Sequence, residues 1–154
     1  MSKHDTQSIR NVAFIGGPGT GKTSVVEALL HEAGVTKRLG SVADGTTLSD
    51  FDAEEKDKQH SVRAGFLHAD VKGCRLHLLD APGYPDFVGE AASCLAAAET
   101  AALVVNAHEG LCFPARKAWD LAGRTNKVRF IVLTHLDQTE TGVLQLSYWA
   151  TRNR

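Results

Sequence analysis

The feature that most constrains this chain is a glycine-rich loop that lies between an apolar run and a helical pattern. Residues 12–15 are apolar, the loop reads Gly16-x-x-x-x-Gly21-Lys22-Thr23, and residues 22–33 carry apolar side chains at three- and four-residue spacing. Glycines let the backbone curl until successive N–H groups point at one anion, and the helix that follows adds its positive N-terminal end. This order of elements predicts a phosphate-binding loop at the start of an α/β domain.

Each residue of this loop has a predicted part in holding a nucleotide. The Lys22 ammonium group is expected to reach the outer phosphates, and the Thr23 hydroxyl to ligate Mg²⁺. A plain glycine turn, the alternative, explains neither the apolar strand before the loop nor the amphipathic helix after it. The predicted nucleotide-binding residues of the loop are Gly16, Gly17, Pro18, Gly19, Thr20, Gly21, Lys22 and Thr23.

The rest of the chain alternates between strand and helix patterns. We expect strands at 61–69, 74–79, 101–106 and 128–133, and helices at 86–100 and 114–123. The turn Val71-Lys72-Gly73 joins the first two of these strands as a hairpin. The pattern predicts an α/β P-loop NTPase fold, with a mostly parallel sheet, one antiparallel edge strand and helices on both faces. Ligands bind beyond the carboxyl ends of strands in such sheets, and every motif described here follows a strand.

A second motif, Asp80-x-Pro82-Gly83, ends the strand at 74–79. A carboxylate at this place can hold the water shell of Mg²⁺, as the second metal-side acid of P-loop enzymes does. Gly83 can present its backbone N–H to a γ-phosphate, because no side chain obstructs the approach. Taken alone, the motif also fits an ordinary turn made of proline and glycine. Its place at a strand end, after the phosphate loop, favours the metal-side interpretation.

A third motif, Thr134-His135-Leu136-Asp137, follows the strand at 128–133. An aspartate carboxylate can accept two hydrogen bonds from the ring N–H and the amino group of guanine, which adenine cannot offer. Thr134 is predicted to steady the loop through its hydroxyl, and His135 to stack on the base. From these four residues alone, a simple loop after a strand is the favoured interpretation.

Composition narrows the partners of the chain. Its 154 residues are the size of one domain, 43% of them are apolar, and the net charge is −1. There is no global basic field to draw the chain to DNA or to an anionic membrane. No apolar run is long enough to cross a bilayer, and residues 1–10 lack the apolar core of a signal peptide. Cys74, Cys94 and Cys112 match no zinc spacing, so we expect free thiols in a cytoplasmic protein.

Taken in order, the three motifs resemble the GTPase domain of translation factors, and most closely that of elongation factor G. The resemblance runs from about Asn11 to Asp137. Its most specific stretch, Asp80-Ala81-Pro82-Gly83-Tyr84-Pro85-Asp86-Phe87, is similar to the family's DTPGHxDF. Thr46-Thr47-Leu48-Ser49-Asp50-Phe51, followed by Glu54-Glu55, resembles the first switch region. Residues 83–90 are most similar to the elongation factor G-like paralogues, which carry a tyrosine where the translocase has a histidine.

The resemblance implies a switch that binds GTP and GDP, hydrolyses GTP with the help of Mg²⁺ and works on the ribosome. Lys22 would bind the β- and γ-phosphates, Thr23 would ligate Mg²⁺, and Asp80 would support the ion through water. Ser61 falls where the first-switch threonine of the family closes over Mg²⁺ and the γ-phosphate. Asp137 would read guanine. Residues 38–60 would order and disorder with the γ-phosphate.

The sequence departs from the translocase pattern at several positions. Tyr84 replaces the histidine that positions the attacking water, and a phenol is a poor general base at neutral pH. The candidate catalytic residues are therefore Lys22, Gly83 and Tyr84, and we expect only slow intrinsic hydrolysis. Gly19 replaces an aspartate of the translocase phosphate loop, His135 replaces a lysine and Thr134 an asparagine.

The expected parts of the chain are a polar tail at 1–10, a P-loop GTPase domain at 11–137 and a divergent tail at 138–154. The family continues after the third motif with a further strand and helix, which carry a second guanine contact, and with ribosome-binding domains. The resemblance therefore implies that the domain is incomplete here. Three interpretations stay open: a slow GTPase, a nucleotide-binding module that does not hydrolyse, and a truncated relic of a translation factor.

Overall fold

The computed structural model describes residues 5–49 and 63–138. Within these residues, five strands form one sheet in the order β2-β3-β1-β4-β5. Their bounds are β1 (Ile9–Gly16), β2 (Gly65–Val71), β3 (Cys74–Asp80), β4 (Thr100–Asn106) and β5 (Val128–Thr134). β1 pairs in parallel with β3 and β4, and β4 with β5, whereas β2 and β3 are antiparallel. The predicted sheet, mostly parallel with one antiparallel edge strand, is confirmed.

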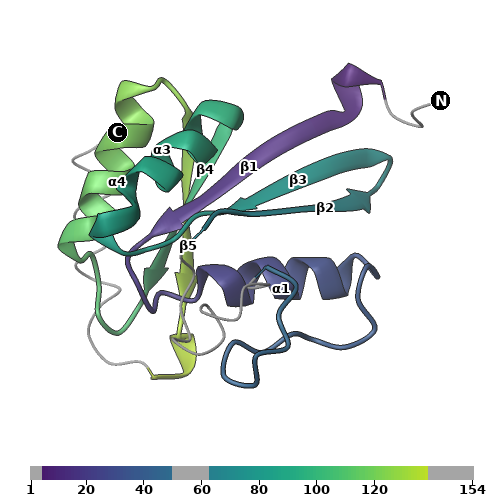
Figure 1. Cartoon of the computed structure of the whole chain (residues 1–154), viewed down its shortest axis with the longest axis horizontal. Helices are drawn as coiled ribbons and strands as arrows, with labels where there is room; N and C mark the ends of the chain where they lie inside the picture. Colours follow the sequence, from purple (N-terminus) through teal and green to yellow (C-terminus); the bar gives the residue numbers. More distant parts are fainter. Residues whose placement is uncertain (1–4, 50–62, 139–154) are drawn as a thin grey trace.

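Helices cover both faces of this sheet (Figure 1). On one face α1 (Lys22–Glu32) buries Val26 and Leu30 against Phe14 of β1. On the other face α3 (Val88–Ala97) and α4 (Phe113–Arg124) pack against the neighbouring residues Ala13 and Ile15. Successive strand residues therefore serve opposite layers, as the two-residue period of a strand requires. β4 is buried along almost its whole length, which explains its unbroken apolar sequence.

Some elements begin or end at other residues than the sequence indicated. β1 begins at Ile9 rather than at residue 12, because its first residues pair with β3 from Arg75 onward. The helix expected at 86–100 is shorter: a 3₁₀ turn, η2 (Pro85–Phe87), precedes it, and α3 ends at Ala97. Thr100 belongs instead to β4, where it pairs with Val12.

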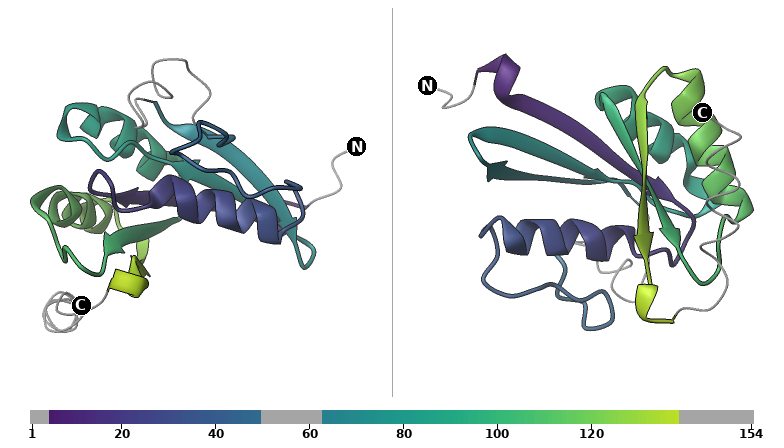
Figure 2. Two further views of the ribbon diagram at one scale, coloured as in Figure 1. Left: turned by 90° about the horizontal axis from the view of Figure 1, so that it is seen from below. Right: turned by 180° about the vertical axis from the view of Figure 1, so that it is seen from behind.

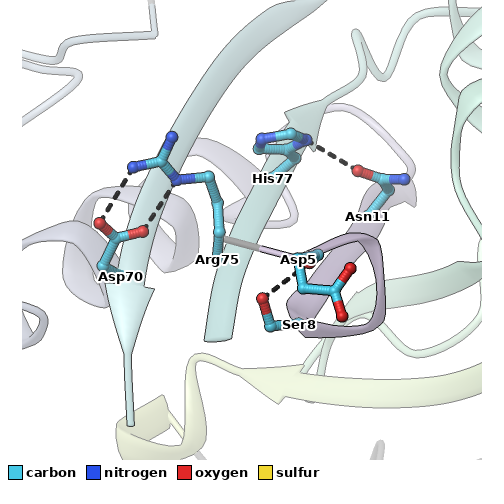
Figure 3. A network of polar contacts seen from close by, with 6 residues as sticks. All are labelled: Asp5, Ser8, Asn11, Asp70, Arg75 and His77. Atoms are coloured by element: carbon cyan, nitrogen blue, oxygen red, sulfur yellow. Dashed lines mark hydrogen bonds and ion pairs between the residues drawn. The ribbon is translucent and has the colours of Figure 1, made fainter. Parts of the chain in front are cut away.

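The β2–β3 hairpin is fixed by its turn and by a pair of charges. Lys72 and Gly73 both have positive φ, 49° and 81°, the backbone that a two-residue turn between twisted strands requires. Asp70 and Arg75 are directly opposite in the two strands and form a bidentate ion pair with distances of 2.9 and 3.0 Å. Figure 3 shows this pair beside the contact of His77 Nδ1 with Asn11 Oδ1, at 2.8 Å. An exposed pair adds little stability, but it favours the observed register.

The connections around β1 place the functional crevice. From β1 the chain passes first to the β2–β3 hairpin on one side and later to β4 on the other. In open α/β sheets ligands bind beyond the strand carboxyl ends at such a switch point. Figure 2 shows α1 leaving the end of β1 at this place, with the end of β5 nearby. No helix in the described part of the chain has the length and apolar character of a membrane span.

Candidate functional site

The phosphate loop occupies the crevice at the end of β1, and its glycines meet specific backbone demands. Gly19 and Gly21 have φ of 69° and 82°, in the left-handed region that side chains disfavour. A β-carbon on Gly16 would run into the carbonyl oxygen of Val104 on β4. Gly21 is also the N-cap of α1, so the positive end of that helix faces the loop. The local sequence thus builds a cradle of the kind that binds anions.

Lys22 lies folded over this loop. Its side chain is 7% exposed, and its Nζ donates a hydrogen bond of 2.7 Å to the Gly17 carbonyl oxygen. The Thr20 hydroxyl donates to the same oxygen at 2.9 Å. Burial lowers the pKa of Lys22, and the charges of Asp80 and Cys112 offset part of that effect. A cation that is desolvated in this way gains strongly from an incoming phosphate.

Thr23 and Asp80, which the sequence assigns to the metal side, meet in the structure. The Thr23 hydroxyl donates a 2.6 Å hydrogen bond to Asp80 Oδ2 across 57 residues of sequence. Both side chains are buried, at 9% and 1% exposure. A hydroxyl beside a carboxylate fits Mg²⁺, which prefers a few protein oxygens together with phosphate oxygens.

The Asp80-x-Pro82-Gly83 segment closes on the phosphate loop. A β-carbon on Gly83 would lie 2.5 Å from Lys22 Nζ and 2.6 Å from the Gly17 carbonyl oxygen. Only glycine allows this approach of the two backbones. The predicted contact of the Gly83 N–H with a γ-phosphate stays a prediction. Ser61, the other predicted metal ligand, lies outside the described residues, as do Asp50, Phe51, Glu54 and Glu55 of the first switch region.

The third motif borders the same loop from the β5 side. The Thr134 hydroxyl donates to the Thr20 carbonyl oxygen at 2.7 Å, across 114 residues of sequence. A β-carbon on Gly21 would lie 3.6 Å from the Thr134 methyl group and 3.7 Å from the His135 ring. Asp137 is exposed in the short turn η3 (Leu136–Gln138). A cleft of about 460 Å³ extends from the loop glycines to this motif. Its lining includes Gly19, Gly21, Thr134, His135 and Asp137.

Comparison with known proteins identifies this arrangement. A family model described as the elongation factor Tu GTP binding domain matches residues 7–150. The chain belongs to this family. The "Elongation factor G-like protein" of Mycobacterium tuberculosis (strain ATCC 25618 / H37Rv) is 42% identical over 129 residues, which cover 84% of this chain and 18% of that protein. "Ribosome-releasing factor 2, mitochondrial" of Pongo abelii is 34% identical over 131 residues, covering 85% of this chain and 17% of that protein.

Solved structures agree with this assignment. A crystal structure of a protein from Thermus thermophilus superposes with a TM-score of 0.89 at 39% identity, covering 94% of this chain and 22% of that one. A bacterial selenocysteine-specific elongation factor superposes with a TM-score of 0.71 at 22% identity, covering 91% of this chain and 22% of that one, which shows the shared fold alone. The chain spans about a fifth of the length of the relatives it matches. It is a GTP-binding domain of the elongation factor G-like translational GTPases.

Tyr84, the residue in place of the translocase histidine, lies in a second hollow of this GTP-binding domain. Its side chain lines a mainly apolar pocket of about 120 Å³ between the second motif and the start of α4. Val88 and Phe113 line the same pocket and are 57% and 66% exposed. Gly16, the first residue of the phosphate loop, lines this pocket as well.

Two residues near the nucleotide site, Cys112 and Glu27, were not predicted from the sequence. Cys112, the N-cap of α4, places its sulfur where a β-carbon on Gly17 would come within 2.5 Å. Glu27 of α1 is fully buried, and its carboxylate accepts backbone N–H groups from Leu48 and Ser49. Only Glu27 had a signal in the sequence: an acid on the same helical stripe as Val26 and Leu30. Among the described residues, no group of three or more His, Cys, Asp or Glu side chains is placed to hold a metal ion.

Proposed function

We propose that this GTP-binding domain binds GTP and GDP together with Mg²⁺ and hydrolyses GTP slowly. The observation that carries the proposal is the Thr23–Asp80 hydrogen bond beneath the buried Lys22. It joins α1 and β3 at the end of the phosphate loop. A cation, a hydroxyl and a carboxylate thus converge where a triphosphate and its metal ion would lie. A turn without a ligand would gain nothing from burying these three groups together.

The residues of this site act by positioning and by neutralising charge. Lys22 would hold the β- and γ-phosphates, and the loop N–H groups with the α1 N-terminus would hold the phosphate oxygens. Thr23, Asp80 through water and Ser61 would hold Mg²⁺, which when bound neutralises charge on the phosphate oxygens. The Gly83 N–H would donate to the γ-phosphate. Little covalent chemistry is left for the protein to do, because phosphoryl transfer depends mainly on alignment and electrostatics.

The second candidate function is nucleotide binding without useful hydrolysis. Tyr84 favours it, because a phenol that lines an apolar pocket is a poor acceptor for a proton from water. Single-turnover hydrolysis of GTP distinguishes the two. A slow but Mg²⁺-dependent rate that disappears in Lys22→Ala supports the GTPase, whereas a wild-type rate equal to that of the variant supports the binding module.

A titration tests the binding itself. Fluorescent GDP and GTP are added to the protein with Mg²⁺, and ATP is then added as competitor. We expect saturable binding that ATP does not displace and that Lys22→Ala abolishes. Lys72→Ala is a matched control, because Lys72 is an exposed lysine in the β2–β3 turn, at the far end of the sheet. Undiminished affinity in Lys22→Ala, or equal affinity for ADP and GDP, would contradict the assignment.

We further propose the ribosome as partner and the cytoplasm as the place of action. The support is the family resemblance and the printed name of one relative, a ribosome-releasing factor. Sedimentation with ribosomes in the presence of a non-hydrolysable GTP analogue tests this partner. Binding that GDP weakens would support it. Equal recovery in the pellet with either nucleotide, or none, would contradict a nucleotide-controlled partnership.

A further inference from the structure

Glu27 clamps residues 40–49, the described part of the predicted first switch segment, onto the phosphate-loop helix. It lies one helical turn after Thr23 and is 0% exposed. Its Oε1 accepts the backbone N–H of Leu48 at 2.6 Å and that of Ser49 at 3.3 Å. On the other side, a β-carbon on Gly40 would collide with the same carboxylate and would lie 3.1 Å from the Thr47 α-carbon. One buried carboxylate thus accepts hydrogen bonds from one stretch of the segment and lies against another.

This clamp brings Ser49 beside the metal-side acid. Gly65, the first residue of β2, pairs with Asp80 in the hairpin register. A β-carbon on Gly65 would lie 3.1 Å from the Ser49 β-carbon and 3.5 Å from the Asp80 β-carbon. Ser49 and Asp80 therefore border the same small space, which glycine leaves open.

The Ser49 hydroxyl is a buried polar group. The residue is 5% exposed, and its Oγ has no hydrogen-bond partner among the residues that the structure describes. A buried hydroxyl of this kind destabilises a fold unless something satisfies it. Thr23 and Asp80 nearby already fit a magnesium site, and the waters around Mg²⁺ both donate and accept hydrogen bonds. A bound ion with its water shell would supply the missing partner.

We propose that Ser49 is an outer-shell residue of the magnesium site and that Glu27 is the residue that positions it. This inference rests on the proposed function and adds a hydroxyl to the metal side formed by Thr23 and Asp80. Outer-shell groups orient the ligands and waters of a metal ion, and their loss weakens metal affinity. The clamp also gives the nucleotide site a direct link to the first switch segment, through the helix that carries Lys22 and Thr23.

The test measures magnesium dependence rather than turnover. The release rate of fluorescent GDP is followed as a function of Mg²⁺ concentration, and the half-effective concentration is compared between variants. Ser49→Ala is expected to raise it about tenfold, the lower end of what outer-shell losses cost. Release in the presence of EDTA should stay as in wild type. The midpoint of thermal unfolding without nucleotide should be unchanged or higher, because an unsatisfied buried hydroxyl is removed.

Ser41→Ala is the matched control for Ser49→Ala. Ser41 lies in the same segment, but its hydroxyl already accepts the backbone N–H of Asp44 at 3.3 Å. Its Mg²⁺ dependence should equal that of wild type. If Ser49→Ala shifts no more than this control in a protein whose GDP release depends on Mg²⁺, the outer-shell role is overturned while the proposed function stands. Wild-type release that ignores Mg²⁺ overturns both.

The positioning role of Glu27 is tested separately and without nucleotide. Glu27→Ala should speed amide hydrogen exchange at Leu48 and Ser49 by at least about tenfold relative to the control Val26→Ala. This control removes buried side-chain volume from the same helix, and Val26 packs in the core rather than against the segment. In the Ser49→Ala background, Glu27→Ala should raise the Mg²⁺ requirement no further, because residues that act through one contact are not additive. A full additional shift in the double variant would overturn the assignment of Glu27.

Discussion

Replacing Lys22 with methionine should separate the stability of the fold from nucleotide affinity. The substitution keeps the length of the side chain and removes its charge. The lost hydrogen bond to the Gly17 carbonyl is worth about 1 kcal/mol. That carbonyl keeps the Thr20 hydroxyl at 2.9 Å, so no acceptor is left unsatisfied. Because the cost of burying the ammonium group disappears as well, we expect the nucleotide-free variant to match wild-type stability within about 1 kcal/mol, or to exceed it.

Nucleotide affinity should respond in the opposite direction. Each hydrogen bond from a charged donor to a phosphate contributes roughly 1.5–3 kcal/mol, which corresponds to roughly a 10- to 150-fold loss in affinity for GDP. Loss of a γ-phosphate contact should make the loss larger for GTP. Residues that serve binding commonly lower the stability of the fold. Lys22 fits this pattern, because its side chain is only 7% exposed and a bound phosphate would offset the cost of burying its charge.

The same reasoning predicts how the free energy of unfolding and the GDP affinity change with pH. In the folded, nucleotide-free protein burial lowers the pKa of Lys22 from its ordinary 10.5. Between the lowered value and 10.5 the unfolded chain binds a proton that the folded protein does not, so the free energy of unfolding rises with pH across this window. Phosphate favours the charged lysine, so GDP affinity falls as pH rises through the same window. Lys22→Met should show neither slope.

Urea denaturation and fluorescent GDP titration, each at several pH values, measure both effects on the two proteins. A nucleotide-free variant that loses more than about 2 kcal/mol would show that Lys22 stabilises the fold, contrary to this reasoning. Unchanged GDP affinity would show that the ammonium group does not meet the phosphates.

Three further results are expected. Gly83→Ala would place a methyl group 2.5 Å from Lys22 Nζ and 2.6 Å from the Gly17 carbonyl oxygen. We expect GTP binding, measured by competition, to weaken at least about tenfold, and GDP binding to weaken less. Equal losses for the two nucleotides would argue against a γ-phosphate contact. Cys94 is 1% exposed and burial raises its pKa to about 11, so at about pH 8 it should resist iodoacetamide until the protein unfolds, as peptide mass spectrometry can show. Rapid labelling of the native protein would contradict this. Asp137→Asn should shift preference from guanine to xanthine nucleotides, because an amide can donate to the carbonyl that xanthine carries in place of the guanine amino group; an unchanged preference would remove the guanine role.

The features that the sequence reveals are those that depend on local chemistry. The loop glycines are recognisable because Gly19 and Gly21 need a left-handed backbone, and the helix that follows shows its period over eleven residues. The sheet follows from apolar runs that alternate with helices. The meeting of Thr23 and Asp80 also follows, because Thr23 lies in the first turn of the helix after β1, Asp80 ends β3, and β1 and β3 are parallel neighbours.

The features that it hides are contacts between distant segments that have no local pattern. The sulfur of Cys112 against Gly17 depends on where α4 begins, and nothing near Cys112 in the sequence indicates its neighbour. The helix predicted at 86–100 is too long because its alanine-rich sequence favours a helix. In the structure Thr100 pairs with β1 and therefore belongs to β4. The place of Glu27 on a buried helical stripe is visible in the sequence, but its partners are not, since its hydrogen bonds go to backbone groups 21 and 22 residues away.

The two halves of the nucleotide site are built differently, and this difference predicts how binding energy divides between them. The phosphate half rests on buried groups: Lys22, Thr23 and Asp80 are at most 9% exposed. The base half follows β5, an edge strand of the described sheet, and its carboxylate, that of Asp137, is exposed. Exposed hydrogen bonds compete with water and contribute less than buried ones of the same geometry. The phosphates should therefore supply most of the affinity, and the base most of the selectivity. The 2.7 Å hydrogen bond from Thr134 to the Thr20 carbonyl couples the halves, so a change in the base loop should also reach the phosphates.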